Sequence, residues 1–223
     1  AICLHGILLD KEMLKNKTFL ESFPNKQLIL VNLPGFGEST MLKHLSFYEL
    51  NKTINKFTDY LELEQFELIG FCLGGDIAFD YSIKYPHRVK KLTLIETMIY
   101  FPNWLNIFFV PNVEKFYYSL VETDFFKNYL INNPYFGANS ENSIVFDGFK
   151  KADFKDNLKY LKMVKKYSKL NHLNRIKEST IPLEIMMAEY SAPEIQRTTK
   201  SLLIVRPDTT VKRIEGCGHL MNS

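Results

Sequence analysis

The sequence has few of the features that mark secreted, metal-binding, membrane-spanning or nucleic-acid-binding proteins. Its three cysteines, Cys3, Cys72 and Cys217, cannot all pair and show no zinc-like spacing with histidine. No run of about 18 uninterrupted apolar residues is present, which excludes an ordinary transmembrane helix. A net charge of only +3 gives no general attraction for nucleic acid. We therefore expect a cytoplasmic protein without a metal or organic cofactor.

The two ends of the chain suggest a trimmed domain. The sequence opens inside the apolar run Ala1–Leu4, with no visible signal peptide, and stops four residues after His219. We expect a natural protein of this type to extend at both ends. The 223 residues are 46% hydrophobic, which is enough material for the core of one domain.

Short apolar runs alternate with helical patterns, which predicts an α/β fold with a mostly parallel sheet flanked by helices. Ser46 and Glu49 form a capping box before an amphipathic pattern, and Gly74 and Gly75 open a second helix that Pro86 ends. The predicted strands occupy residues 1–4, 27–32, 66–70, 91–95, 182–187 and 210–214.

The strand pattern stops between residues 98 and 178, where we expect helices joined by Pro/Asn/Gly turns. This segment is predicted to be a helical cap inserted into an α/β core of residues 1–97 and 179–223. Its first half, residues 99–136, holds 13 of the 31 aromatic residues, and its second half is rich in lysine. The cap should cover the carboxyl edge of the sheet, where open α/β sheets place their binding sites.

The segment Leu68–Gly75 has the pattern of a strand, a G-x-C-x-G turn and a helix. Such a turn presents its central side chain, here Cys72, from a strained backbone, and the flanking glycines avoid clashes. The helix N-terminus favours a thiolate, and the Leu73 N–H becomes a candidate oxyanion donor. The alternative interpretation is a small buried cysteine in a fold that has lost its activity.

Several segments, in the same order along the chain, together resemble the α/β-hydrolase superfamily. The departure is Cys72, where most members carry serine; dienelactone hydrolases and polyhydroxyalkanoate synthases resemble this chain in using cysteine, whereas its cap looks more like that of small carboxylesterases. The resemblance implies that His5 shapes the oxyanion loop and that Ile7 supplies the second oxyanion N–H. The matching segments are His5-Gly6, Leu33-Pro34-Gly35-Phe36-Gly37-Glu38-Ser39, the Cys72 turn, Tyr85-Pro86-His87-Arg88-Val89 and Gly216-Cys217-Gly218-His219.

His219 is the predicted general base, because it follows a strand in a Gly-rich loop that can bring the imidazole to Cys72. The other histidines outside the His-Gly pair, His44, His87 and His172, lie in polar sequence and are expected to be exposed. They are not candidates for catalysis.

The acidic partner of His219 is ambiguous. By resemblance to the family, Ser191 stands where an aspartate is expected, and serine cannot stabilise an imidazolium as a carboxylate does. Glu96 instead ends the strand at residues 91–95, similar to the arrangement in haloalkane dehalogenases. We expect Glu96 to complete a Cys-His-Glu triad, with Glu189 as the reserve acid.

A cysteine nucleophile would form an acyl-cysteine intermediate, which suits a hydrolase of carboxylic esters or thioesters. Two alternatives stay open: an acyltransferase that uses the same intermediate, and a non-catalytic ligand-binding protein with a hydrolase fold. The aromatic half of the cap suggests an apolar acyl chain. The basic half, residues 150–177, has ten Lys or Arg against two Asp and could dock an acidic acyl carrier protein or the phosphates of coenzyme A.

Overall fold

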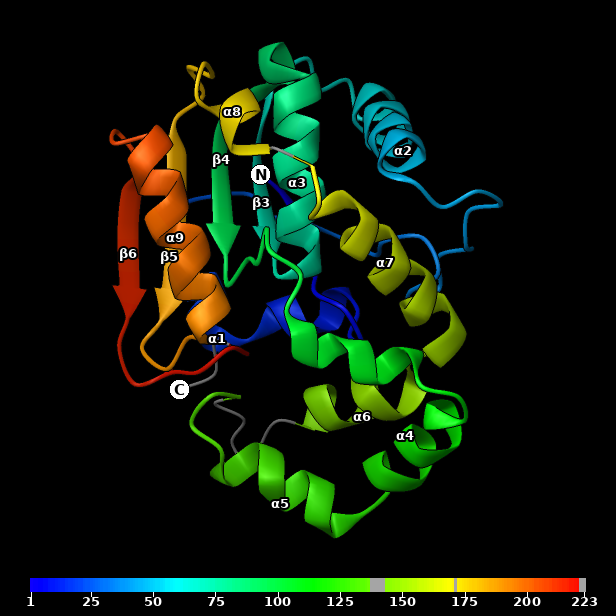
Figure 1. Ribbon diagram of the computed structural model, residues 1–223. Helices are drawn as coiled ribbons and strands as arrows, with labels where there is room; N and C mark the ends of the chain where they lie inside the picture. The colour runs from blue at the N-terminus through cyan, green and yellow to red at the C-terminus, as the bar shows by residue number, and fades with distance from the viewer. Residues whose placement is uncertain (137–142, 171, 221–223) are drawn as a thin grey trace.

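The computed structural model describes residues 1–136, 143–170 and 172–220, and these residues form one six-stranded sheet (Figure 1). The sheet order is β2-β1-β3-β4-β5-β6, and all neighbouring strands are parallel. The predicted α/β fold is therefore confirmed, and each predicted strand is present within two residues at its ends. The strands are β1 (Ile2–Leu4), β2 (Ile29–Val31), β3 (Phe66–Phe71), β4 (Val89–Ile95), β5 (Leu183–Ala188) and β6 (Thr210–Ile214).

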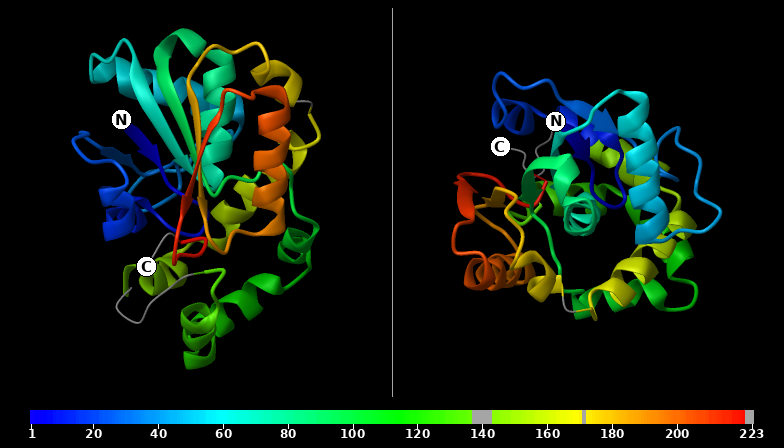
Figure 2. Two further views of the ribbon diagram at one scale, coloured as in Figure 1. Left: turned by 90° about the vertical axis from the view of Figure 1, so that its left-hand side faces the viewer. Right: turned by 90° about the horizontal axis from the view of Figure 1, so that it is seen from above.

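Helices flank both faces of this sheet. The helices α3 (Leu73–Lys84) and α9 (Pro193–Val205) lie on one side, and α1 (Lys17–Glu21) lies on the other (Figures 1 and 2). The helix α2 (Phe47–Tyr60) packs against α3 and begins as predicted, because the Ser46 hydroxyl accepts a hydrogen bond from the Glu49 N–H at 3.2 Å. Two short 3-10 helices, η1 (Lys11–Lys15) and η2 (Pro86–Arg88), complete this part of the chain.

The chain between β4 and β5 forms helices and no strand in its described residues. Three of these helices, α4, α5 and α6, lie beyond the carboxyl ends of the strands (Figure 1). The division into a core and a cap of residues 98–178 stays a prediction, and residues 137–142 and 171 of that cap lie outside the described residues. The helices are η3 (Asn103–Phe109), α4 (Val113–Val121), α5 (Asp124–Asn132), α6 (Ser143–Lys151), α7 (Phe154–Tyr167) and α8 (His172–Ile176).

Close packing of α3 on the sheet fixes the position of the G-x-C-x-G turn. A Cβ atom on Gly74 would collide with the Leu4 carbonyl oxygen, and one on Gly70 would collide with the backbone of Gly74. Glycine at both positions therefore lets α3 start directly against β1 and β3. In the described part of the chain, no helix is long and apolar enough to cross a lipid bilayer.

Candidate active site

Cys72 occupies a strained backbone position between β3 and α3. Its φ of 48° and ψ of −112° lie outside the regions that non-glycine residues favour. The conformation is held on both sides, because the Cys72 N–H donates to the Ile95 carbonyl oxygen at 2.9 Å and the Cys72 carbonyl oxygen accepts from the Gly75 N–H at 2.9 Å. The side chain thus stands at the N-terminus of α3, as the G-x-C-x-G pattern predicts.

His219 lies in the loop after β6 and contacts both Cys72 and Glu96. Its Nδ1 is 3.1 Å from Glu96 Oε2, and the imidazole is also hydrogen-bonded to the Cys72 side chain. Burial disfavours the imidazolium, but the hydrogen bonds and negative charges of Cys72 and Glu96 outweigh it and raise the pKa of His219 to about 10. The contacts around the ring therefore favour the protonated imidazole.

Residues of the segment between β4 and β5 hold the His219 loop in place. The His219 N–H donates to the Tyr135 carbonyl oxygen, and the Leu220 N–H donates to the Phe136 carbonyl oxygen at 3.0 Å. The Tyr135 ring stacks on the imidazole with centroids 5.3 Å apart and an interplanar angle of 14°. Gly218 lets these backbones approach, since a Cβ there would collide with the Pro134 carbonyl oxygen.

Glu96 follows β4 and is fully buried, with a φ of 47°. Its Oε1 accepts hydrogen bonds from the Ala188 N–H at 2.8 Å and from the Ser191 hydroxyl, while its Oε2 faces His219. A buried carboxylate is costly unless its oxygens are paired, and here both are. Glu96 is therefore built to hold a negative charge next to the imidazole.

The reserve acid Glu189 has a different contact. Its Oε2 accepts a hydrogen bond from the Gly216 N–H at 2.8 Å, and its own N–H donates to the Ile214 carbonyl oxygen at 2.9 Å. The structure thus brings Glu96, and not Glu189, to the ring of His219. Glu189 instead stabilises the turn that leads to it.

His5 is buried and takes one defined tautomer. Its Nε2 accepts a hydrogen bond from the Leu33 N–H at 3.0 Å, so the proton is on Nδ1, which donates to the Gly6 carbonyl oxygen at 2.7 Å. Burial lowers the pKa of His5 to about 4, against the opposing effect of the hydrogen bond to Gly6. His5 therefore joins the loop after β1 to the loop after β2, which is the shaping role expected of it.

The expectation for the other histidines is only partly correct. His44 and His87 are exposed, as predicted, but the prediction for His172 is wrong. His172 is buried, its Nε2 contacts the Tyr167 carbonyl oxygen at 2.7 Å, and its ring stacks on Tyr167 with centroids 3.6 Å apart. On α8, His172 and Ile176 are buried whereas Asn174 and Arg175 are exposed, so the helix turns the imidazole inward.

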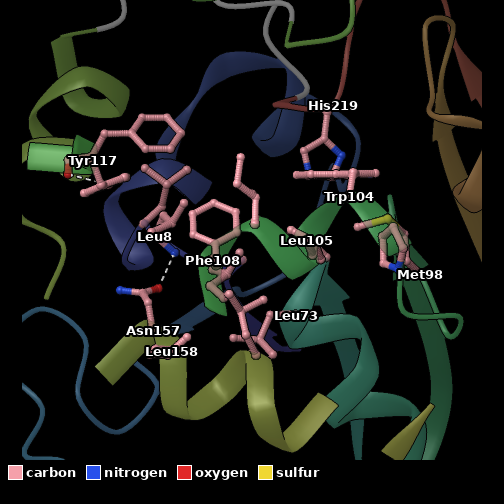
Figure 3. Close-up of a pocket in the computed structure, with 18 of the residues that line it drawn as sticks. Leu8, Leu73, Met98, Trp104, Leu105, Phe108, Tyr117, Asn157, Leu158 and His219 are labelled. Carbon is pink, nitrogen blue, oxygen red and sulfur yellow. Dashed lines mark hydrogen bonds between the residues drawn. The ribbon is translucent and has the colours of Figure 1, made fainter. Parts of the chain in front are cut away.

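A cavity of about 340 Å³ opens at Cys72 and His219 and is bordered almost entirely by apolar side chains (Figure 3). Ile7 and Leu73, the predicted oxyanion donors, border it as well, and the Leu73 N–H starts a helix and so has no intrahelical acceptor. None of the described residues around this cavity is Lys or Arg. Its aromatic and aliphatic wall includes Met98, Trp104, Leu105, Phe108, Phe126, Leu130, Phe149, Leu158 and Leu161.

Three features of this site were missed in the sequence. Tyr135 covers the imidazole, Ser191 binds Glu96, and Asp76 borders the cavity one turn along α3 from Cys72. The spacing of four residues between Cys72 and Asp76 on a predicted helix could have identified the last of these. The first two depend on long-range contacts that no local pattern encodes.

The face of α7 turned away from the apolar cavity carries positive charge. It borders a second cavity of about 760 Å³, where Asp80 is the acidic residue. The basic residues around this second cavity are Lys43, Lys84, Lys159, Lys162, Lys166 and Arg175.

The described ranges of the chain hold no cluster of three or more His, Cys, Asp or Glu side chains that could bind a metal ion.

Comparison with known proteins identifies the family. The family model described as the alpha/beta hydrolase fold matches residues 2–132, which is more than half of the chain. The chain therefore belongs to the α/β-hydrolase family.

Individual relatives are similar over shorter stretches. A protein of Bacillus subtilis (strain 168), named as a provisional 2-succinyl-6-hydroxy-2,4-cyclohexadiene-1-carboxylate synthase, is 32% identical over 101 residues, which are 44% of this chain and 36% of that protein. Monoacylglycerol lipase ABHD6 of Rattus norvegicus is 35% identical over 100 residues, 43% of this chain and 29% of the lipase. The matched stretch thus spans about a third of either relative.

Among solved structures, MenH from S. aureus has a TM-score of 0.71 at 22% identity, covering 98% of this chain and 85% of that one. This similarity extends the shared fold over nearly the whole chain, including the segment between β4 and β5.

Proposed function

We propose that the protein hydrolyses uncharged carboxylic esters or thioesters with an apolar acyl group, through an acyl-cysteine on Cys72. The observation that carries this proposal is the hydrogen-bonded series Cys72–His219–Glu96 at the mouth of the apolar cavity. A nucleophile, a base and a group that orients the base form the arrangement typical of covalent acyl transfer.

The first half of the reaction acylates Cys72. The thiolate attacks the carbonyl carbon of the substrate, and a C–S bond forms while the carbonyl oxygen becomes an oxyanion near the N–H groups of Ile7 and Leu73. When this tetrahedral intermediate collapses, the bond to the leaving alcohol or thiol breaks. The His219 imidazolium gives its proton to that leaving group, and Glu96 keeps the ring oriented through Nδ1.

The second half releases the acid. A water molecule attacks the acyl-cysteine carbonyl, and neutral His219 removes its proton as a general base. The C–S bond then breaks, the carboxylic acid leaves, and the Cys72 thiolate with protonated His219 is restored. An alcohol, amine or thiol in place of this water would give the acyltransferase alternative with the same residues.

The composition of the cavity favours an uncharged substrate. The name of the Bacillus subtilis relative describes a product with a carboxylate, and such a product calls for cationic partners in an apolar pocket. The described residues around the cavity of this chain include Asp76 but no Lys or Arg. We therefore place the substrate closer to the monoacylglycerol esters named for the lipase relative than to a carboxylate-bearing compound.

The decisive experiment is intact-protein mass spectrometry after brief exposure to p-nitrophenyl esters of increasing acyl length. We expect an acyl adduct mapped to Cys72, release of nitrophenol, and loss of both in Cys72→Ala. Cys3→Ala is the matched control, because Cys3 is fully buried in β1 and its pKa is raised to about 12, mainly by burial. Adding alcohol acceptors then distinguishes hydrolysis from acyl transfer.

Two results would contradict the proposal. Full adduct formation in Cys72→Ala would mean that another residue is the nucleophile. Absence of adduct and of nitrophenol release with every ester would favour the non-catalytic binding protein, and ligand binding to the apolar cavity would then be measured by the change in Trp104 fluorescence.

A carrier-linked substrate is the second candidate, and the basic face of α7 favours it. Lys162 and Lys166 border the second cavity and have no acidic partner among the described residues, whereas Lys159 pairs with Asp156 at 2.7 Å. An acidic acyl carrier protein would bind such a surface through charge, which salt screens. Raising salt should thus reduce turnover of carrier-linked substrate but not of a small ester, and equal salt dependence of both would exclude the carrier.

A further inference from the structure

The apolar cavity contains one carboxyl group that the proposed mechanism does not use. Asp76 lies in the first turn of α3 and borders the cavity together with Cys72 and Leu73. Its side chain is only 5% exposed, and its N–H approaches the Cys72 carbonyl oxygen at 3.3 Å. Asp76 therefore lies one helical turn from the nucleophile, on the side of α3 that faces the cavity.

The Asp76 carboxyl group lacks the partners that a buried charge needs. Its Oδ1 is inaccessible to solvent and has no hydrogen-bond partner among the described residues, and none of those residues that border the cavity is Lys or Arg. Burial, and secondarily the negative charge of Cys72, hold the pKa of Asp76 well above its usual range. Burial thus favours the neutral carboxylic acid, which has one O–H donor.

Three other polar side chains around the cavity already have partners. Asn157 accepts from the Leu8 N–H at 2.8 Å (Figure 3), and the Tyr117 hydroxyl donates to the Phe149 carbonyl oxygen at 2.8 Å. His219 is held by Glu96 and Cys72. Asp76 differs from all of these, because its hydrogen-bonding capacity remains for a ligand. A buried donor without an acceptor costs stability, so its presence beside a reactive sulfur indicates a role with the ligand bound.

We propose that Asp76 determines specificity by donating a hydrogen bond to a hydroxyl or carbonyl oxygen that the substrate carries close to its scissile ester. Residues four apart on a helix have Cβ atoms about 5–6 Å apart, so a group held by Asp76 must lie near the carbonyl that Cys72 attacks. That oxygen can belong to the acyl part, as in a 3-hydroxyacyl ester, or to the alcohol part, as in a glycerol monoester. This inference rests on the proposed function and refines its substrate class.

The test uses two matched pairs of esters and three variants. The acyl-side pair is p-nitrophenyl 3-hydroxybutanoate and p-nitrophenyl butanoate, and the alcohol-side pair is glycerol 1-monobutanoate and propyl butanoate. Each is measured with wild type, Asp76→Ala and Asp76→Asn, which keeps an N–H donor. Asp80→Asn is the control on the same helix, because Asp80 is equally buried but is bound by Asn51 and Tyr167 and does not border this cavity.

We expect Asp76→Ala to lower kcat/KM for the hydroxylated member of one pair at least about tenfold more than for its match, which corresponds to one lost hydrogen bond. Asp76→Asn should restore much of that preference, and Asp80→Asn should not alter it. The pair that responds shows whether the oxygen belongs to the acyl or the alcohol part.

Equal losses within both pairs would overturn the assignment while leaving the proposed function intact. Hydrolysis of none of the four esters by the wild type would instead contradict the proposed function, and the assignment with it. Thermal unfolding gives a readout without activity. Because Oδ1 has no partner among the residues that the structure describes, Asp76→Ala should not lower Tm, whereas a clear decrease would show that the carboxyl group serves the fold.

Discussion

Ser191 occupies the position at which the family pattern predicts an acid, and its hydroxyl donates a hydrogen bond to the Glu96 carboxylate that lies beside His219. Ser191 follows β5 and Glu96 follows the neighbouring strand β4, so the two strand ends bring the side chains together. In this chain the carboxylate that contacts His219 therefore follows β4, and the Ser191 hydroxyl after β5 is hydrogen-bonded to it.

Removing the Ser191 hydroxyl should reduce the stabilisation of the Glu96 carboxylate. Ser191→Ala leaves Glu96 Oε1 with the Ala188 N–H alone. A hydrogen bond to a charged group contributes about 1.5–3 kcal/mol, so we expect acylation of Cys72 to slow by about 10-fold or more. Ser201→Ala is the control, because Ser201 lies on α9 outside the cavity and accepts a hydrogen bond from the Tyr100 hydroxyl. Stopped-flow measurement of nitrophenol release gives the rate directly.

Because Glu96 and Ser191 are in contact, the carboxylate can be moved from one position to the other by substitution. Glu96→Gln should impair acylation, and adding Ser191→Asp to it should restore part of the rate by returning a carboxylate to the position expected from the family. Ser191→Asp alone should be harmful, since two buried carboxylates in contact repel each other and one must take up a proton. No recovery in the double variant would mean that the β5 loop cannot bring a carboxylate to His219.

The pH profile distinguishes Glu96 from Glu189. The negative charges of Glu96 and Cys72 overcome burial and raise the pKa of His219 to about 10, so Glu96→Gln should lower that pKa. The imidazolium then loses its proton at lower pH, and the basic limb of the acylation profile should move toward neutrality. Glu189→Gln removes a charge from a side chain that contacts the Gly216 N–H and not the His219 ring, so it should leave that limb in place. A basic limb that moved only in Glu189→Gln would reverse the assignment of the acid.

Much of the fold could be predicted from the sequence because its determinants are local. The apolar runs, the Ser46 cap and the glycines around Cys72 act within a few residues, and the structure has the strands and helices where those patterns occur. The place of Glu96 could also be anticipated, because a carboxylate after a buried strand must find a partner.

What could not be predicted depends on contacts between distant segments. Ser191 contacts Glu96 across 95 positions. Tyr135 stacks on His219, but the aromatic composition of its segment does not indicate which aromatic ring will face the imidazole. His172 was expected to be exposed because its sequence neighbours are polar, yet the packing of α8 buries it against Tyr167. In each case the deciding term is tertiary packing rather than local propensity.

The buried His5 predicts a loss of stability in mild acid. Its folded-state pKa is lowered to about 4, chiefly by burial, while the unfolded chain takes up the proton near the ordinary value of 6.5. Above about pH 6.5 the ring is neutral in both states, so His5 does not make the free energy of unfolding depend on pH. As pH falls toward 4, the unfolded state binds a proton that the folded state excludes, and this lowers the free energy of unfolding. The free energy of unfolding should therefore decrease by about 1.4 kcal/mol for each pH unit in this window, or about 2 kcal/mol between pH 6.5 and pH 5.

Urea unfolding of wild type and of His5→Asn at both pH values isolates this contribution. Asparagine cannot titrate but keeps a donor for the Gly6 carbonyl oxygen, so the variant should be less stable at pH 7 and lose less stability on acidification. It retains the smaller effect of His172, whose pKa burial also lowers. An identical decrease in both proteins would mean that His5 is not the group that titrates.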